Sequence, residues 1–310
     1  MSSRAVKYGF ALALIVVLFY LADVRQLWAA LCELTWRAVL NLGLLSVILI
    51  YLSCYKWKIF IENFGSSVSI HRLFGLYLIG YFINLLVPSY VGGDAVRSWY
   101  IGKNVGQHQA LSATILERYT GMVAMMTLGV VFVWFARLAT WPMRAAILLM
   151  AAGLALITLL ALSRSALRFV CRYRHFKKIV AHLEKVQDGL HLAGSNRPLL
   201  ARALAASFVF HSFTVVNTLV AAWAVGRENP PIWELFVALP IILLIGSLPV
   251  SPSGLGLQEG AFMFFLSGLG ATPAQALGVG VILRAKSYVL AVCGWLFWLR
   301  ERAVLKAGQS

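Results

Sequence analysis

Six long apolar runs constrain the fold of this chain more than any other feature. Helices that cross a hydrocarbon core of roughly 30 Å need about 20 predominantly apolar residues each. Only 12% of the 310 residues are charged, against roughly 25% in a soluble domain. The sequence therefore predicts an all-α polytopic membrane protein with six full spanning helices. The runs cover residues 8–22, 38–55, 119–135, 145–162, 203–225 and 274–299.

Two further apolar runs are short, and each ends at a proline. They cover residues 73–87, before Pro88, and 235–248, before Pro249. About fifteen residues at 1.5 Å each fall short of a membrane crossing. The residues after the first run are too polar to face lipid. Both stretches are therefore predicted to form re-entrant helical hairpins, over 73–117 and 235–270.

The two predicted hairpins carry matching motifs. Pro88-Ser89-x-x-Gly92 corresponds to Pro252-Ser253-x-x-Gly256. Gln-Ala-Leu recurs at 109–111 and 275–277, and Ile-Leu at 115–116 and 282–283, all at offsets of 164 to 167 residues. Inverted repeats with broken helices are a transporter signature. We expect one membrane domain, 1–310, with inverted halves 1–162 and 203–310 joined by a basic amphipathic linker, 163–202.

The net charge of +16 is interpreted through membrane topology. Basic residues collect in cytoplasmic loops and face anionic headgroups, so no nucleic-acid partner is expected. This places both termini, the Lys56–Arg72 loop and the linker in the cytoplasm. Lys56, Trp57 and Lys58 are interpreted as anchors at the headgroup level. The linker lies on the cytoplasmic surface, and a partner-binding helix is its alternative role.

Charged residues in and beside the hairpins form the candidate site. Charges at the bilayer centre are costly, so they pair or line a wet cavity. One role is ion pairing that staples the hairpins together. The other is a polar cavity that binds an anionic headgroup, with the cations on phosphate, and the two roles are compatible. The charged candidates are Asp94, Glu117, Glu259, Arg97, Arg118, Arg284 and Lys286.

Uncharged residues complete the candidate site. Asn84 either satisfies the carbonyl freed by Pro88 or lines the cavity, and Gln258 begins the second half-helix. Glycines let the backbone turn with positive φ and approach closely. The predicted loop backbone comprises Pro88, Gly92, Gly93, Pro252, Gly254 and Gly256. His211 is expected to be a hydrogen-bonded core residue rather than a substrate contact.

No catalytic residue, metal or cofactor is predicted. The four cysteines form no C-x-x-C pair and predict no disulfide framework. Walker-type, H-E-x-x-H and G-x-S-x-G motifs are absent from the sequence.

Three motifs carry a resemblance to a known family. They are Asn84-Leu-Leu-Val-Pro88-x-x-x-Gly92-Gly93-Asp94-x-x-Arg97, Glu117-Arg118-x-x-Gly121 and Pro249-x-Ser-Pro-x-Gly-Leu-Gly-x-Gln258-Glu259-Gly260. The chain resembles, over nearly its whole length, the flippase-like transmembrane domain of the lysylphosphatidylglycerol synthase family. In bifunctional members this domain moves an aminoacylated phospholipid between leaflets, and a separate soluble domain makes that lipid.

The chain differs from the family pattern at two positions in its motifs, and it is expected to lack the soluble synthase domain. Many relatives have Gly-Glu at Gly93-Asp94 and Ser-Pro-Gly-Gly at 251–254, so the substrate need not carry over. The sequence ends about ten residues after the last predicted helix, so the chain is expected to be a stand-alone member without aminoacyl transfer.

These observations favour a lipid flippase or transporter rather than an enzyme. The expected location is the cytoplasmic (inner) membrane of a bacterium. The expected substrate is a phospholipid or a polyprenyl-phosphate-linked glycolipid with an anionic or zwitterionic headgroup. Phosphate would bind Arg97, Arg118 and Arg284. The acids would pair with them, and either serve only as ion-pair partners or, if buried, also carry coupling protons. The alternatives are an integral-membrane enzyme that modifies lipid headgroups and a membrane anchor subunit of one. A homo-oligomer or a partner enzyme is compatible with either.

Overall fold

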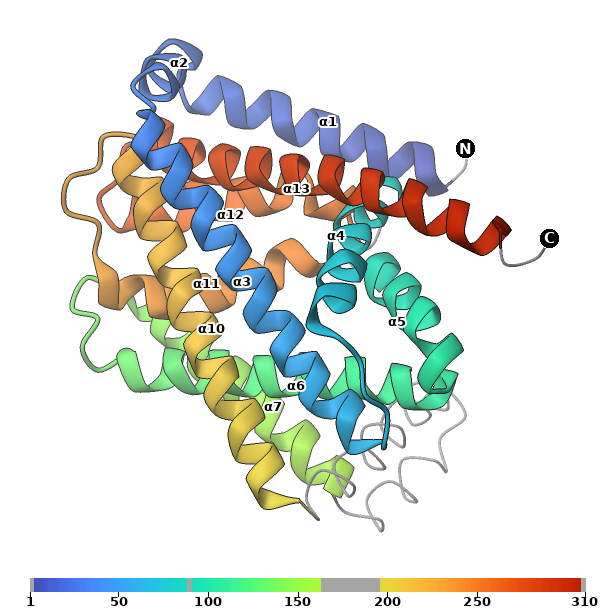
Figure 1. The fold of residues 1–310 in the computed structure, drawn as a ribbon. Helices are drawn as coiled ribbons and strands as arrows, with labels where there is room; N and C mark the ends of the chain where they lie inside the picture. The colour runs from blue at the N-terminus through green and yellow to red at the C-terminus, as the bar shows by residue number, and fades with distance from the viewer. Residues whose placement is uncertain (1–2, 88–90, 163–195, 308–310) are drawn as a thin grey trace.

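The described part of the chain is built from helices. The structure is a computed structural model that describes residues 3–87, 91–162 and 196–307. Figure 1 shows the helices packed into one body, with both chain ends at the same end of the molecule. The elements are α1 (Ser3–Leu21), α2 (Val24–Cys32), α3 (Trp36–Asn63), α4 (Ile70–Leu86), α5 (Val91–Val105), α6 (Gln107–Phe132), α7 (Trp141–Leu162), α10 (Arg197–Ala224), α11 (Ile232–Ser247), the 3-10 turn η2 (Pro252–Gly254), α12 (Leu257–Gly268) and α13 (Pro273–Ala307).

Membrane-length helices confirm the predicted fold class. Within the described residues, α3, α6, α7, α10 and α13 are long and apolar enough to cross a membrane. The bent pair Lys7–Leu21 and Val24–Cys32, with an angle of 84° between its helices, adds a sixth span if it is counted as one. The bend lies at Asp23, whose backbone has φ 56° and whose side chain accepts a hydrogen bond from the Arg25 N–H. The chain is therefore an all-α polytopic membrane protein.

Helices α4 and α11 are short and apolar, and each ends before a proline. A residue that precedes proline is pushed out of the α region. Val87 and Leu248 accordingly adopt extended conformations, with ψ of 131° and 135°. After the break, α5 packs on α4 and α12 packs on α11. Pro88 itself lies outside the described residues.

The first return arm is shorter than predicted. Helix α5 ends at Val105, and Gly106 then takes φ 94°, which redirects the chain into α6. Glu117 and Arg118 therefore belong to a full-length helix, not to a hairpin ending at residue 117. They are tolerated there because α6 packs against α3, α5 and α10, which gives its polar face protein neighbours.

The boundary of the linker also differs from the prediction. Residues 163–195 lie outside the described part of the chain. Residues 197–202 belong to α10, which begins after Asn196; the Asn196 side chain accepts a hydrogen bond from the Leu199 N–H. Pro198 fits the first turn, where its missing N–H leaves no helix bond unmade.

Candidate functional site

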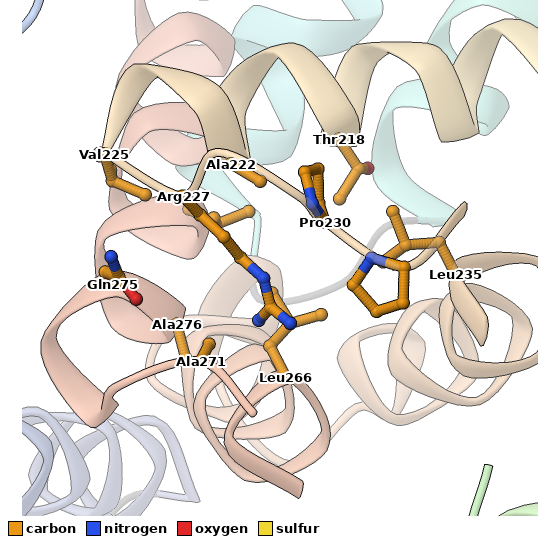
Figure 2. A pocket seen from close by; sticks show the side chains of 12 residues that line it. Thr218, Ala222, Val225, Arg227, Pro230, Leu235, Leu266, Ala271, Gln275 and Ala276 are labelled. Carbon is orange, nitrogen blue, oxygen red and sulfur yellow. The ribbon is translucent and has the colours of Figure 1, made fainter. Parts of the chain in front are cut away.

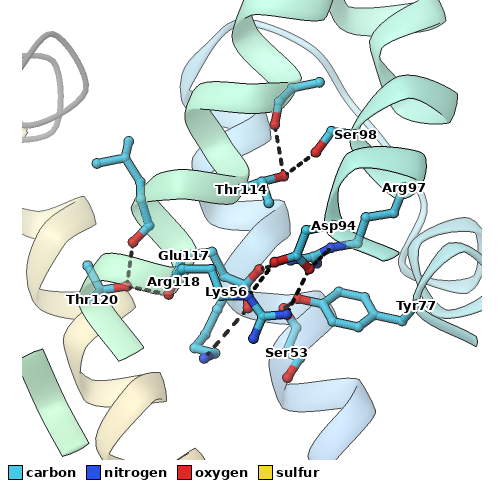
Figure 3. Close-up of polar contacts among 12 residues, drawn as sticks. Ser53, Lys56, Tyr77, Asp94, Arg97, Ser98, Thr114, Glu117, Arg118 and Thr120 are labelled. Atoms are coloured by element: carbon cyan, nitrogen blue, oxygen red, sulfur yellow. Dashed lines mark hydrogen bonds and ion pairs between the residues drawn. The ribbon is translucent and has the colours of Figure 1, made fainter. Parts of the chain in front are cut away.

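The Arg97 guanidinium is the centre of a buried ion-pair network (Figure 3). Its Nε lies 3.0 Å from Asp94 Oδ1, and its Nη2 lies 2.7 Å from Glu117 Oε2. The side chain is 1% exposed, and its Cζ lies over the rings of Trp57 and Tyr77, 4.6 and 4.2 Å from their centroids. Two carboxylates and two aromatic rings therefore hold the Arg97 guanidinium in a fixed position, which favours a structural role over ligand binding.

Arg118 belongs to the same network but faces outward. Its Nε and Nη2 donate to Asp94 Oδ2 and Oδ1 at 2.8 and 2.7 Å, a bidentate pair. Its side chain is 57% exposed, while that of Asp94 is 20% exposed. Consecutive residues on a helix point about 100° apart, so Glu117 faces the core while its neighbour Arg118 reaches the rim.

Lys56 on α3 completes this network. Its Nζ lies 3.8 Å from Glu117 Oε1 and 4.3 Å from the centroid of the Phe210 ring. With Lys56, the network holds three cations and two carboxylates, which leaves one positive charge in excess. The excess positive charge can interact with solvent or an anionic ligand at the exposed Arg118 side chain. We call these five side chains, Lys56, Asp94, Arg97, Glu117 and Arg118, the first network.

A second network clamps the loop after α11. Arg284 on α13 donates through Nε to Glu259 Oε1 at 2.5 Å, and through Nη1 and Nη2 to the carbonyls of Ser253 and Gly254 at 2.7 and 3.1 Å. Its Nη2 also lies 3.4 Å from Gln258 Oε1. Glu259 Oε2 in turn accepts from the Gly256 N–H at 2.8 Å, as in a capping box. One arginine and one glutamate therefore fix the loop without excess charge.

The two networks are equivalent parts of the two halves. In each, an acid in the first turn after the loop pairs with an arginine on the next long helix: Asp94 with Arg118, and Glu259 with Arg284. The two arms of each hairpin also cross at glycine. A Cβ on Gly93 would lie 2.4 Å from the Gly80 carbonyl oxygen, and one on Gly254 would lie 2.2 Å from that of Gly246. Gly80 and Gly246 are 166 residues apart, which matches the offset of the sequence motifs.

Asn84 on α4 links the first hairpin to the second loop. Its Oδ1 accepts a hydrogen bond from the Gly93 N–H at 2.8 Å. Its backbone carbonyl has no helical donor, because the residue four positions on is Pro88, which lacks an N–H. The Ser253 hydroxyl of the other half donates to that carbonyl instead. The carbonyl freed by the proline is thus that of Asn84 itself, and a residue 169 positions away satisfies it.

The positions of Lys286 and Lys56 differ from the sequence-based prediction. The charged candidates form two networks instead of one cluster, and Lys286 belongs to neither: its Nζ donates to Asn217 Oδ1 at 2.7 Å. Lys56 and Trp57, interpreted above as headgroup anchors, are 3% and 0% exposed. The missed signal was the apolar stretch 59–61 after Lys58, which continues α3 to Asn63 and leaves Lys56 inside the helix.

Two cavities lie outside the networks. One is enclosed by α10, α11, α12 and α13, and Arg227 points into it (Figure 2). Arg227 Nη2 donates to the Leu269 carbonyl at 2.6 Å, which satisfies the carboxyl end of α12. The other lies between α6, α10 and α11 and is lined by His211, which is half-buried. Arg227 thus has a structural role at a helix end, and His211 lies at the α6–α10 contact.

Comparison with known proteins places the chain in a family. Residues 5–294 match the model of the lysylphosphatidylglycerol synthase transmembrane region. The chain belongs to this family. The resemblance drawn from the loop motifs is thereby confirmed. The match also supports a multi-pass membrane protein with a lipid-related function.

Individual relatives share only about a quarter of their aligned residues with this chain. A UPF0104 membrane protein of Methanocaldococcus jannaschii is 25% identical over 76% of each chain. One of Methanothermobacter thermautotrophicus is 23% identical over 81% of this chain and 79% of its own. The glycosyltransferase AglD of Haloferax volcanii is 25% identical over 77% of this chain but only 45% of that protein. No solved structure matches the chain.

Proposed function

We propose that this protein moves a lipid with an anionic or zwitterionic headgroup between the leaflets of a bacterial cytoplasmic membrane. The observation that carries the proposal is the pair of equivalent loop, acid and arginine units, one in each half, joined at Asn84 and Ser253. Broken helices that meet between repeats are how many transporters build a substrate site, and rocking of the repeats then alternates its exposure. The substrate is a phospholipid or a polyprenyl-phosphate-linked glycolipid.

Arg118 is the residue we assign to the headgroup phosphate. It has the exposed guanidinium of the first network, and the network carries one positive charge in excess. A guanidinium presents a planar fork of donors that matches phosphate oxygens. Asp94 already binds the Nε and Nη2 of Arg118, so the phosphate would bind at the Nη1 of its exposed side chain. Arg97 and Arg284, also expected to hold phosphate, are instead occupied by carboxylates and loop carbonyls.

The proposed orientation places both termini in the cytoplasm. Its support is the basic content of the 58–72 and 163–202 segments, together with the position of both chain ends at the same end of the molecule (Figure 1). The two hairpins would then enter the membrane from opposite sides.

A translocation assay in proteoliposomes tests the proposal. Fluorescent or isotopically labelled phosphatidylglycerol is followed between leaflets for the wild type and for Asp94→Asn, Arg118→Ala and Glu259→Gln. Loss of one charge-assisted contact is expected to slow translocation at least about tenfold. Glu62→Gln, a surface change outside both networks, is the matched control and should behave as wild type. Wild-type rates in all three folded variants would refute the site.

An enzyme that modifies lipid headgroups is the second candidate, because one relative is named a glycosyltransferase. The same vesicles distinguish the two functions. Lipids extracted after incubation with candidate sugar donors are analysed by mass spectrometry. A covalently changed headgroup would favour the enzyme, and translocation of unchanged lipid would favour the transporter. Activity of the purified protein by itself would exclude a role as a mere anchor subunit.

A further inference from the structure

Lys286 is a membrane-depth cation that lies outside both networks. It lies on α13, 13 residues after Pro273 and 15 before Glu301, the limits of the apolar span. At 1.5 Å per residue this places it about 20 Å along the helix from either limit, near the middle of the span. Its side chain is half-buried. A charge at this depth is expected to pair or to serve a function.

No carboxylate neutralises Lys286 within the described residues. Every cation of the two networks lies within 4.0 Å of an Asp or Glu oxygen, whereas Lys286 has no such ion pair. Its bond is to Asn217 Oδ1, at 2.7 Å, on the neighbouring helix α10. An amide oxygen orients an ammonium group but does not cancel its charge.

The ammonium of Lys286 also points away from the second loop. Residues two positions apart on a helix lie about 200° apart around its axis. Arg284 faces the second loop, and Lys286 therefore faces α10, where Asn217 is 5% exposed. An ammonium has three donors. Asn217 uses one, and two remain for a ligand.

We propose that Lys286 is a second anion site, separate from Arg118, that binds a phosphate-diester oxygen of a lipid headgroup. The inference rests on the proposed function for the source of the phosphate. A half-buried ammonium is a compact point charge, which suits a phosphate oxygen that arrives from the membrane. Asn217 holds the ammonium in position while the ligand supplies the missing negative charge. The protein then has one cationic binding site for the headgroup in each half: Arg118 in the first and Lys286 in the second.

Equilibrium binding of phosphatidylglycerol tests the site directly. Delipidated protein is titrated with phosphatidylglycerol or phosphatidylcholine and the complexes are counted by native mass spectrometry. Lys286→Met should weaken phosphatidylglycerol binding at least about tenfold, because one charge-assisted contact is lost. Lys103→Met, which removes the same charge from an exposed position on α5, is the control and should bind as wild type.

Stability measurements separate a ligand site from a structural contact. Without lipid, Lys286→Met should unfold at a temperature no lower than wild type, since an uncompensated charge has been removed. Lys286→Gln, which keeps a donor for Asn217, should also lose the lipid. Unchanged phosphatidylglycerol affinity in both variants would overturn the proposal and leave Lys286 as a structural partner of Asn217. Competition by soluble glycerol phosphate at equal strength would overturn the lipid as the source of the phosphate.

Failure of this inference is distinguishable from failure of the proposed function. If Arg118→Ala stops translocation while Lys286→Met binds phosphatidylglycerol normally, the Lys286 site is wrong and the transporter stands. If Lys286→Met loses the lipid while Arg118→Ala translocates at the wild-type rate, the Lys286 site stands and the assignment of Arg118 falls.

Discussion

At the scale of single residues, burial separates charges that hold the fold from charges that meet a ligand. Arg97 and Glu117 are 1% and 2% exposed and pair with one another, while Arg118, the residue after Glu117, is 57% exposed. Removing one member of a buried pair leaves the other charge uncompensated, which costs more than the pair contributes. Removing a rim charge leaves Asp94 paired with Arg97. The same network is therefore expected to respond to substitution in two different ways.

Glu117→Gln should destabilise the protein strongly. The substitution leaves Arg97 and Lys56, both nearly fully buried, with less negative charge. We expect a loss of about 3–5 kcal/mol in the free energy of unfolding, measured by denaturant titration in detergent micelles. Glu62→Gln breaks a pair whose glutamate is 43% exposed and should cost about 1 kcal/mol or less. Equal losses in the free energy of unfolding for the two substitutions would show that the first network stabilises the fold no more than a surface ion pair does.

At the scale of elements, each hairpin depends on glycines where its two arms cross. A Cβ on Gly93 would meet the Gly80 carbonyl oxygen at 2.4 Å, and one on Gly254, which has φ +65°, would meet that of Gly246 at 2.2 Å. Backbone atoms cannot move aside as a side chain does. The close approach is what lets the Gly93 N–H reach Asn84 and lets Arg284 reach the Gly254 carbonyl.

Alanine substitution at these crossings should disrupt the hairpins. Gly93→Ala and Gly254→Ala are each expected to cost about 1–3 kcal/mol of stability from overpacking, and to lower translocation with it. Gly153→Ala on α7, where nothing lies within 4 Å of the added carbon, should be neutral or stabilise by roughly 0.5–1 kcal/mol through helix propensity. Unfolding temperatures of the three variants in one detergent provide the comparison. Normal stability of Gly93→Ala would contradict the crossing.

The sequence predicted the elements better than their contacts. Pro88 and Pro249 marked both helix breaks because a missing N–H and a restricted preceding residue act locally. Gly106 gave no comparable warning, since glycine is tolerated within a helix. Lys56 was misplaced because a lysine beside a tryptophan is also typical of a membrane interface, and burial by α6 and α10 is decided by tertiary packing. Gly80 and Gly246 are separated by the repeat offset, but the sequence alone does not predict that the hairpin arms cross at these glycines.

At the scale of the whole molecule, the two halves define an orientation that labelling can test. We expect Ser66→Cys, between α3 and α4, to react with a membrane-impermeant maleimide only after spheroplasts are permeabilised. Asn229→Cys, between α10 and α11, should react in intact spheroplasts. The reason is that Lys58 and Arg72 flank this connection, and basic residues favour the cytoplasmic side. Native cysteines, of which Cys32 and Cys293 are exposed, are first replaced by serine. The opposite labelling pattern would invert the proposed topology.

The link between the halves rests on a serine in an unusual conformation. Ser253 has φ 49° and ψ 29°, a left-handed conformation that favours glycine. Its hydroxyl donates to the Asn84 carbonyl that Pro88 leaves without a donor, and its own carbonyl accepts from Arg284. One residue thus connects the second network to Asn84 on α4, which also binds the Gly93 N–H next to Asp94. If the halves rock as units, this bond must break or move with them.

Ser253→Gly should uncouple the two loops with little loss of global stability. Glycine relieves the left-handed backbone by about 1–2 kcal/mol, which offsets the roughly 1–3 kcal/mol cost of leaving the Asn84 carbonyl unsatisfied. Ser253→Ala loses the bond without that relief and should be the less stable variant. Hydrogen exchange provides the measurement: in Ser253→Gly, amides of the 91–97 segment, Gly93 above all, should exchange faster than in wild type. A rise confined to residues 251–259 would show that the bond is a local contact, because coupling between the halves requires that a change in one loop be felt in the other.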